Sequence, residues 1–194
     1  MIIALTGPIG SGKSEVAKIL SRHGFKLVDA DRLGHELLTP QTETWGKVVH
    51  AFGVRVLNRG GVVNRKKLGE IVFGDTKALA KLNQIMHPPL KARIAEVVKE
   101  FKSSPENKLD DILVINAALP QLFEGLADKV ILVNSKQPNR LKRLLKKGLD
   151  RSQALKRMKA QVPQKKYQAI ADFVINNDST LKKLNEQVQT RIQL

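Results

Sequence analysis

Residues 7–14 read Gly-Pro-Ile-Gly-Ser-Gly-Lys-Ser, a glycine-rich segment between a short apolar run and a helical pattern. The glycines permit backbone angles that a side chain would forbid, so successive N–H groups can curl around an anion. A helix that begins near Lys13 directs the positive end of its dipole to the same place. The spacing Gly-x-x-x-x-Gly-Lys-Ser, with a strand before it and a helix after it, predicts a loop that binds the phosphates of a nucleoside triphosphate.

The residues of this loop receive specific expected roles. Lys13 should reach the β- and γ-phosphates of ATP, the co-substrate, and the Ser14 hydroxyl should bind Mg²⁺, the cofactor. The backbone of Gly10, Ser11 and Gly12 should complete the ATP site. A glycine-rich turn with no ligand is the alternative, and the flanking strand and helix weigh against it.

Apolar runs of strand length alternate with helical patterns along the rest of the chain. Such alternation predicts an α/β fold of three layers, in which helices cover both faces of a parallel sheet. The expected strands cover residues 2–6, 26–28, 112–115, 130–133 and 173–175. The clearest expected helices cover residues 13–23, 139–147, 151–160 and 181–194.

We expect a single domain over residues 1–194 with two additions to the central sheet. A mostly helical insertion, about residues 32–102, should form the substrate side of the cleft. A basic segment, about residues 138–165, should form a lid that closes over ATP. Within it, Arg143 is the candidate that stabilises charge on the transferring phosphoryl group, and a solvated charged helix face is the alternative.

Two acidic residues, Asp29 and Asp31, follow the second expected strand. Ligands of parallel α/β sheets bind beyond the carboxyl ends of the strands, so both carboxylates should face the phosphate loop. Asp31 is the candidate that takes the proton of an acceptor hydroxyl as it attacks the γ-phosphoryl group. Asp29 should support it on the substrate side or hold a Mg²⁺-bound water. The alternative is that Asp31 caps a helix starting at Arg32.

The composition narrows the class of protein. The chain has no cysteine, which excludes disulfides, thiolate metal sites and cysteine nucleophiles. The longest apolar runs are of strand length, too short to span a bilayer, so we expect a cytoplasmic protein with no membrane partner. We further expect a monomer or a small homo-oligomer. The net charge of +16 attracts polyanions, but aromatic residues make up only 4% of the chain, so nucleic acid is not the expected partner.

Further motifs follow in order along the chain. They are Val-Asp-Ala-Asp-Arg at 28–32, Val-Asn-Arg-Lys-Lys-Leu at 63–68, Ile-Met-His-Pro at 85–88, Pro-Gln-Leu-Phe-Glu at 120–124 and Ala-Asp-Phe-Val-Ile-Asn-Asn at 171–177. With Arg157 and Gln161, this series resembles the dephospho-coenzyme A kinase family from residue 2 to about residue 185. The resemblance implies a P-loop kinase fold and ATP-dependent phosphorylation of the 3′-hydroxyl of dephospho-CoA, the last step of coenzyme A biosynthesis.

Three further candidate site residues, Arg65, His87 and Asn177, lie in the motifs of this resemblance, and Arg93 on the next expected helix is a fourth. Arg65 would bind a phosphate of the acceptor substrate, and Arg93 would contact the same molecule. His87 would hydrogen-bond the substrate ribose, and we expect its backbone to be extended because two prolines follow it. Asn177 would lie on the adenine side of the ATP site. Each has a structural alternative. Arg65 could simply follow a helix N-cap, and Arg93 could be a solvated cation. His87 could be a local structural anchor, and Asn177 could be part of a turn.

Two positions depart from the family pattern. Asn116-Ala117-Ala118-Leu119 stands where the family usually carries an Asp at the end of its third strand. A carboxylate that helps to hold Mg²⁺-bound water is therefore absent, which gives more weight to Asp29 and Asp31. Lys146-Lys147 stands where the family commonly has Arg, and Lys lacks the fork that binds phosphate through two parallel hydrogen bonds.

Two other functions remain open from the residues alone. A nucleoside or nucleotide kinase could use the same fold, because fold does not determine the acceptor. A nucleic-acid-binding NTPase would explain the positive charge together with the phosphate loop. The ordered series of motifs favours dephospho-CoA as the acceptor over both.

Overall fold

The structure, a computed structural model, describes residues 1–108 and 111–192 and confirms the predicted α/β fold. Its five strands are all parallel and lie in the order β2-β3-β1-β4-β5. Their bounds are β1 (Ile2–Thr6), β2 (Lys26–Asp29), β3 (Leu113–Asn116), β4 (Lys129–Asn134) and β5 (Phe173–Asn176). Because β1 is the central strand, the glycine-rich loop leaves the middle of the carboxyl edge, where ligands of such sheets bind.

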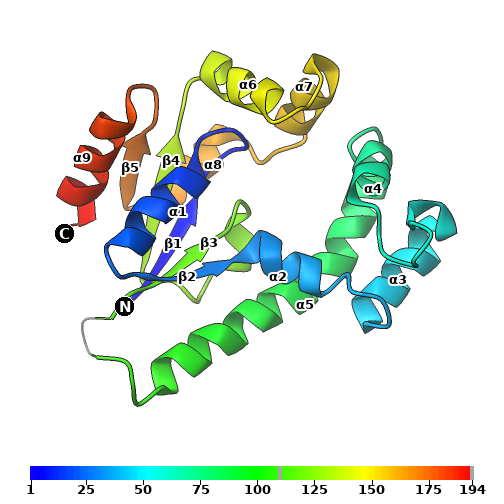
Figure 1. The fold of residues 1–194 in the computed structure, drawn as a ribbon, viewed down its shortest axis with the longest axis horizontal. Coiled ribbons are helices and arrows are strands. Elements are labelled where there is room, and N and C mark those ends of the chain that lie inside the picture. The colour runs from blue at the N-terminus through cyan, green and yellow to red at the C-terminus, as the bar shows by residue number, and fades with distance from the viewer. Residues whose placement is uncertain (109–110, 193–194) are drawn as a thin grey trace.

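Helices pack on both faces of the sheet and form three layers (Figure 1). On one face, α1 (Lys13–Arg22) and α9 (Leu181–Ile192) cover Ile3, Leu5 and Val114. On the other face, α2 (Ala30–Glu36) and the second half of α5 (Thr76–Ser103) cover Ile2 and Ile115. The last two residues of the helix expected over 181–194 lie outside the described residues.

The helical middle of the chain has a small core of its own. It contains α3 (Glu43–Phe52), the 3₁₀ turn η1 (Val54–Val56), α4 (Arg65–Val72) and the first half of α5. The buried centre of this cluster consists of Val48, Phe52, Val56, Val63, Leu68 and Val72. The expected turn at Gly60-Gly61 is present, and the Trp45 indole N–H donates to the Gly61 carbonyl at 2.9 Å.

The prediction of an extended backbone at His87 is wrong. Helix α5 continues through His87, Pro88 and Pro89 without a break. The apolar side chains on either side, Met86 and Leu90, pack against two different clusters of the core, so their burial holds the helix across the prolines. Tertiary packing therefore outweighs the local preference of a residue that precedes proline.

The basic segment forms three helices rather than the two expected: α6 (Gln137–Lys146), α7 (Arg151–Lys159) and α8 (Gln164–Ile170). Helix α8 contacts β4 and buries Tyr167, whose hydroxyl donates to the Ala118 carbonyl at 3.0 Å. The sequence pattern missed α8 because Tyr167 is the single residue of its seven that is fully buried.

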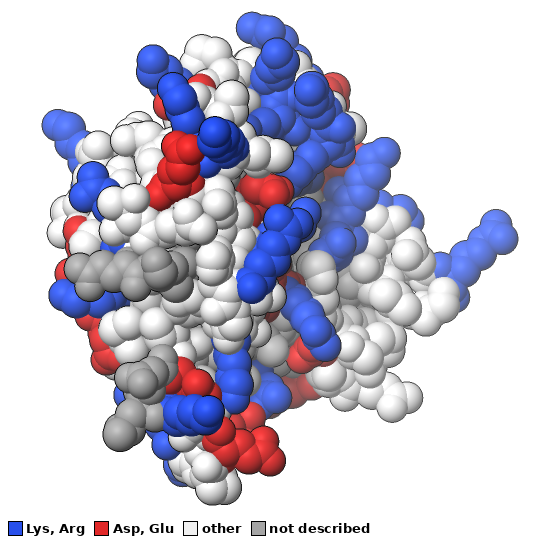
Figure 2. Space-filling view, turned by 60° about the vertical axis from the view of Figure 1, so that its left-hand side comes forward, with Lys and Arg blue, Asp and Glu red and all other residues white. Residues whose placement is uncertain are grey.

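Positive charge is concentrated on this segment. Residues 136–166 contain twelve Lys or Arg and one acidic residue, Asp150. Figure 2 shows many of the Lys and Arg side chains gathered in the upper part of the molecule, the level at which Figure 1 places α6 and α7. In residues 1–108 and 111–192, no helix is both long enough and apolar enough to cross a membrane.

Candidate active site

The glycine-rich loop is held tightly between its neighbours. A Cβ atom at Gly7 would lie 2.2 Å from the Val133 carbonyl oxygen, and one at Gly12 would lie 2.0 Å from Asn177 Nδ2. Both residues also have positive φ angles, +143° and +99°, so glycine is required on two grounds. Gly12 is the N-cap of α1 and has no side chain to bind the first N–H groups of the helix, which leaves them available to an anion.

Lys13 lies at the start of α1, and its Nζ donates to the Gly7 carbonyl at 2.7 Å. Burial lowers the pKa of this amine to about 8, because charge is costly away from water. The negative charges of Asp31 and Asp29 raise the pKa, and the positive charges of Arg140 and Lys147 lower it further. The loop thus brings its lysine into the range of two carboxylates and two other cations.

This lowered pKa predicts that ATP affinity decreases at alkaline pH. Bound phosphates favour the charged amine, so its pKa in the complex exceeds the value of about 8 in the free protein. Binding therefore takes up a proton above that value, and the dissociation constant should rise up to about tenfold for each pH unit. Calorimetry of ATP binding between about pH 7 and about pH 9.5 measures this, and a flat profile in that range would contradict it.

The two acids have different environments. Asp29 caps α2: its Oδ1 accepts from the N–H groups of Asp31 and Arg32 at 2.8 and 3.2 Å, and its Oδ2 accepts from Asn116 Nδ2 at 3.0 Å. The helix begins at Ala30, so the alternative in which Asp31 caps it is wrong. The Asp31 side chain is exposed in the first turn and has no hydrogen bond or ion pair within the described chain. Asp31 is therefore the free carboxylate of the pair.

Arg143 supports the loop from behind. Its Nη1 donates to the carbonyls of Gly10 and Ser11 at 3.1 and 3.2 Å and to Ser135 Oγ at 3.0 Å, and its Nη2 donates to the Asn177 carbonyl. A guanidinium with four such contacts is already occupied. This arrangement favours a role in holding the loop over a direct contact with the transferring phosphoryl group.

The Asn177 side chain lies behind the same loop. It is nearly buried, and its Nδ2 donates to the Ser11 carbonyl at 2.9 Å. Asp178, the next residue, accepts from Ser135 Oγ and from the Lys136 N–H at 2.6 and 2.8 Å. These bonds join the segments that follow β4 and β5. They place α6 so that its arginines reach the glycine-rich loop.

Two contacts of the loop at Ile9, and one between the side chains that make them, were not expected from the residue patterns alone. Gln161 Oε1 accepts from the Ile9 N–H at 2.8 Å and from Arg140 Nη2 at 3.2 Å, and Arg140 Nε donates to the Ile9 carbonyl at 2.9 Å. The sequence indicated a role for Gln161 only through its place in the series of family motifs. Nothing in the local sequence indicated Ser135 or Asp178.

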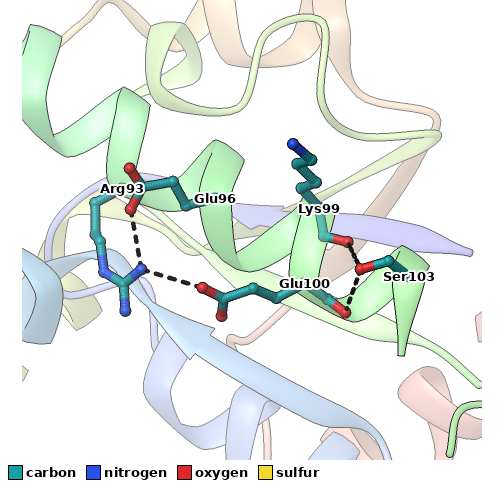
Figure 3. Close-up of polar contacts among 5 residues, drawn as sticks. All are labelled: Arg93, Glu96, Lys99, Glu100 and Ser103. Atoms are coloured by element: carbon teal, nitrogen blue, oxygen red, sulfur yellow. Dashed lines mark hydrogen bonds and ion pairs between the residues drawn. The ribbon is translucent and has the colours of Figure 1, made fainter. Parts of the chain in front are cut away.

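The predicted acceptor-side residues lie on the helical middle of the chain, at different places. Arg65 begins α4, and its Nη1 lies 3.1 Å from His35 Nδ1. His87 is half-buried in α5, and burial lowers its pKa. Arg93 is paired on the same helix with Glu96 and Glu100 at 3.0 and 3.6 Å, as Figure 3 shows. Its ion pairs favour the structural alternative for Arg93.

The basic segment meets the helical middle at one further contact. The Arg157 guanidinium of α7 lies 5.0 Å from the centre of the Phe73 ring, a cation–π distance. A pocket of about 190 Å³ opens beside it, lined by Lys66, Gly69, Glu70, Phe73, Gln153, Lys156 and Arg157. Helix α7 and the helical insertion therefore approach each other directly.

The family model for dephospho-CoA kinase matches residues 1–183. The chain belongs to the dephospho-CoA kinase family. A dephospho-CoA kinase from Carboxydothermus hydrogenoformans is 39% identical, covering 99% of this chain and 93% of its own. The solved structure of the dephospho-CoA kinase from Campylobacter jejuni is 28% identical with a TM-score of 0.68, covering 99% and 95%.

The same fold also occurs outside the dephospho-CoA kinase family. A shikimate kinase from Bacteroides thetaiotaomicron aligns over 100% of this chain and 99% of its own, with a TM-score of 0.58 and 14% identity. At that identity the likeness shows the P-loop kinase fold alone. Sharing this fold therefore does not by itself determine the acceptor.

Proposed function

We propose that this chain transfers the γ-phosphoryl group of ATP to the 3′-hydroxyl of dephospho-CoA, which produces CoA and ADP. Membership of the dephospho-CoA kinase family supports the donor, the acceptor and the place in coenzyme A biosynthesis. One observation supports the chemistry most directly. Lys13, at the start of α1 directly after the loop, is close enough to the free carboxylate of Asp31 for the charge of Asp31 to raise the pKa of Lys13. A cation for the phosphates and an acceptor for a proton thus lie together.

The loop is proposed to bind the ATP phosphates mainly through its backbone. The amides of Gly10, Ser11 and Gly12 would surround the β-phosphate, and Lys13 would exchange its bond to the Gly7 carbonyl for the β- and γ-phosphates. We propose that Arg143 and Asn177 act indirectly, since their hydrogen bonds end on loop carbonyls. The direct roles expected for them, at the phosphoryl group and at the adenine, stay predictions.

Asp31 is proposed as the base of the transfer. Its carboxylate would orient the 3′-hydroxyl and accept its proton while the hydroxyl oxygen bonds to the γ-phosphorus. The bond between that phosphorus and the β,γ-bridging oxygen breaks, and ADP leaves with the electron pair. The exposed, unpaired state of the Asp31 side chain supports this assignment over Asp29.

Mg²⁺ is proposed as the cofactor, held by the Ser14 hydroxyl and the ATP phosphates. Ser14 is exposed in the first turn of α1, directly after Lys13. No group of three or more His, Cys, Asp or Glu residues that could hold a metal occurs in the described part of the chain. A single hydroxyl at this place fits Mg²⁺, which proteins usually hold with one or two side chains while phosphates and water complete the shell. When bound, the ion neutralises charge on the β- and γ-phosphates.

Dephospho-CoA is proposed to bind against the helical insertion, residues 32–102. Arg65 is a candidate for a substrate phosphate because it is exposed at the start of α4, and His87 is a candidate for the ribose. Residues 138–165 would serve as the lid, with Arg157 and Phe73 as a contact between lid and insertion. The proposal includes a cytoplasmic location, since the lack of cysteine fits a reducing compartment.

An acceptor panel tests the proposed function. ADP release from ATP and Mg²⁺ is measured with dephospho-CoA, AMP, adenosine and shikimate, each at the same concentration. We expect kcat/KM for dephospho-CoA to exceed that of every other acceptor by at least about a hundredfold, because a site built to bind a substrate's polar groups rejects molecules that lack them. A preference for AMP or adenosine would instead identify a nucleotide or nucleoside kinase.

A further inference from the structure

Two buried side-chain polar atoms in residues 1–108 and 111–192 have no hydrogen-bond partner: Ser11 Oγ and Asn116 Oδ1. Burying a polar atom without a partner is costly, so such atoms are rare and call for an explanation. Ser11 belongs to the glycine-rich loop, and Asn116 ends the strand next to the one that leads into that loop. Both atoms therefore lie at the carboxyl edge of the sheet, near the proposed site.

The register of the sheet determines where Asn116 stands. It pairs with Leu5 of β1 on one side and with Asp29 of β2 on the other. Val114, two positions earlier, packs in the cluster under α1, and side chains two apart in a strand share a face. Asn116 thus lies on the side of the sheet from which α1 and Lys13 start.

The contact with Asp29 also determines how the amide is oriented. A carboxylate can only accept, so the group that faces Asp29 Oδ2 at 3.0 Å must be the NH₂ of Asn116. The carbonyl oxygen, Oδ1, consequently points away from Asp29 and is the atom without a partner. It offers a neutral acceptor where the family usually has a carboxylate.

We propose that Asn116 is a positioning residue for phosphoryl transfer: its NH₂ holds the Asp29 carboxylate, and its Oδ1 accepts a hydrogen bond from an O–H group of the bound ligands. The O–H group is either a water of the Mg²⁺ shell or the acceptor hydroxyl. This inference rests on the proposed function. It explains the division of labour between the acids, because Asp29 is occupied by three hydrogen bonds and Asp31 is left free.

Two substitutions test the role of Asn116. Asn116→Ala removes both polar groups, and Asn116→Leu removes them while filling a similar volume, so a folded variant is available if the cavity destabilises the first. Asn134→Ala is the matched control. Asn134 ends β4 at the same edge, but its side chain is satisfied on both sides, since it donates to Asn176 Oδ1 and accepts from Gln164 Nε2, both at 3.2 Å. Urea unfolding checks that each protein folds.

Two measurements on these proteins separate the sources of the O–H group. The first is the affinity for ADP with and without Mg²⁺, measured by calorimetry. The second is kcat and KM for dephospho-CoA. We expect kcat/KM to fall at least about tenfold in both Asn116 variants, the effect of one hydrogen bond in a charged network, and less than about twofold in Asn134→Ala. A loss of the Mg²⁺-dependent gain in ADP affinity would identify the metal-bound water, and a rise of KM for dephospho-CoA alone would identify the acceptor hydroxyl.

The inference is overturned if both folded Asn116 variants keep kcat/KM and the Mg²⁺-dependent ADP affinity within about twofold of the parent protein. An equal loss in Asn134→Ala would overturn it as well, because the effect would then be a general one at the strand ends. Failure of the proposed function looks different. In that case the parent protein itself does not phosphorylate dephospho-CoA, and the ADP measurements still test Asn116.

Discussion

Replacing Lys13 by alanine is expected to reduce kcat/KM for ATP by about a thousandfold. The substitution removes a flexible cation that can follow the γ-phosphoryl group as its charge shifts in the transition state, an interaction typically associated with losses of this size. ATP binding should weaken by about a hundredfold, since the lost hydrogen bonds are charge-assisted. ADP release and ATP calorimetry measure the two effects.

The same variant should remain folded. The folded-state pKa of Lys13, about 8, lies below the unfolded value of 10.5, so the unfolded chain binds more protons between these values. The buried charge therefore lowers stability below about pH 8, and stability rises as pH increases from there to about 10.5. Removing the amine should relieve this cost, and Lys13→Ala should unfold at a urea concentration no lower than that of the parent protein. A large loss of stability would show that Lys13 serves the fold instead.

Lys18→Ala provides the matched control for Lys13. Lys18 lies on the same helix, but it is exposed and pairs only with Glu15 at 3.8 Å. An ion pair of this kind contributes little in water. We expect kcat, ATP affinity and unfolding to stay within about twofold of the parent values. A similar loss in both variants would mean that the charge of α1 in general, and not Lys13 in particular, serves the nucleotide.

Replacing Asp31 by asparagine is expected to reduce kcat by about a hundredfold to ten-thousandfold and to leave ATP binding nearly unchanged. Asparagine keeps the shape and can still accept a hydrogen bond, but it cannot take the proton of the attacking hydroxyl. ATP affinity should persist, because the loop amides and Lys13 are intact. Single-turnover measurements separate the chemical step from product release and test this split directly.

Glu36→Gln is the control for Asp31. Glu36 is the last residue of α2 and is exposed and paired with Arg32 at 3.3 Å. It therefore shares the helix and the negative charge of Asp31 but lies at the opposite end of the helix. It should retain full activity. If Asp31→Asn kept near-normal turnover, the assignment of the base would be wrong. Asp29, with its three hydrogen bonds, would be a poor substitute, because accepting a proton would disrupt the cap of α2.

The basic segment has two different uses in this structure. Arg140 and Arg143 direct their guanidinium groups to carbonyls of the loop, which keeps the loop in shape without a ligand. Lys146 and Lys147 are exposed, and Lys147 is close enough to lower the pKa of Lys13. Lys147 is therefore a cation close to the loop that remains for a bound phosphate, and lysine binds phosphate as a point charge without the two parallel hydrogen bonds of arginine.

Several features could be predicted because they depend on neighbouring residues. The strands, the helix after the loop and the turn at Gly60-Gly61 agree with the local patterns. The helical backbone at His87 could not be predicted, because burial of Met86 and Leu90 overrides the local preference of a residue that precedes proline. Helix α8 was missed for a related reason: its amphipathic pattern rests on Tyr167 alone.

The glycine-rich loop and the lysine that follows it were already determined by eight consecutive residues, since a nest of backbone amides followed by a lysine is a local property of backbone angles and side-chain order. Only the tertiary structure decided which acid is free and which arginine is occupied. Asn116 and Asp29 are 87 positions apart in the chain, and Arg143 and Gly10 are 133 apart. Such contacts arise from strand order and helix packing, which place distant residues at the same edge of the sheet.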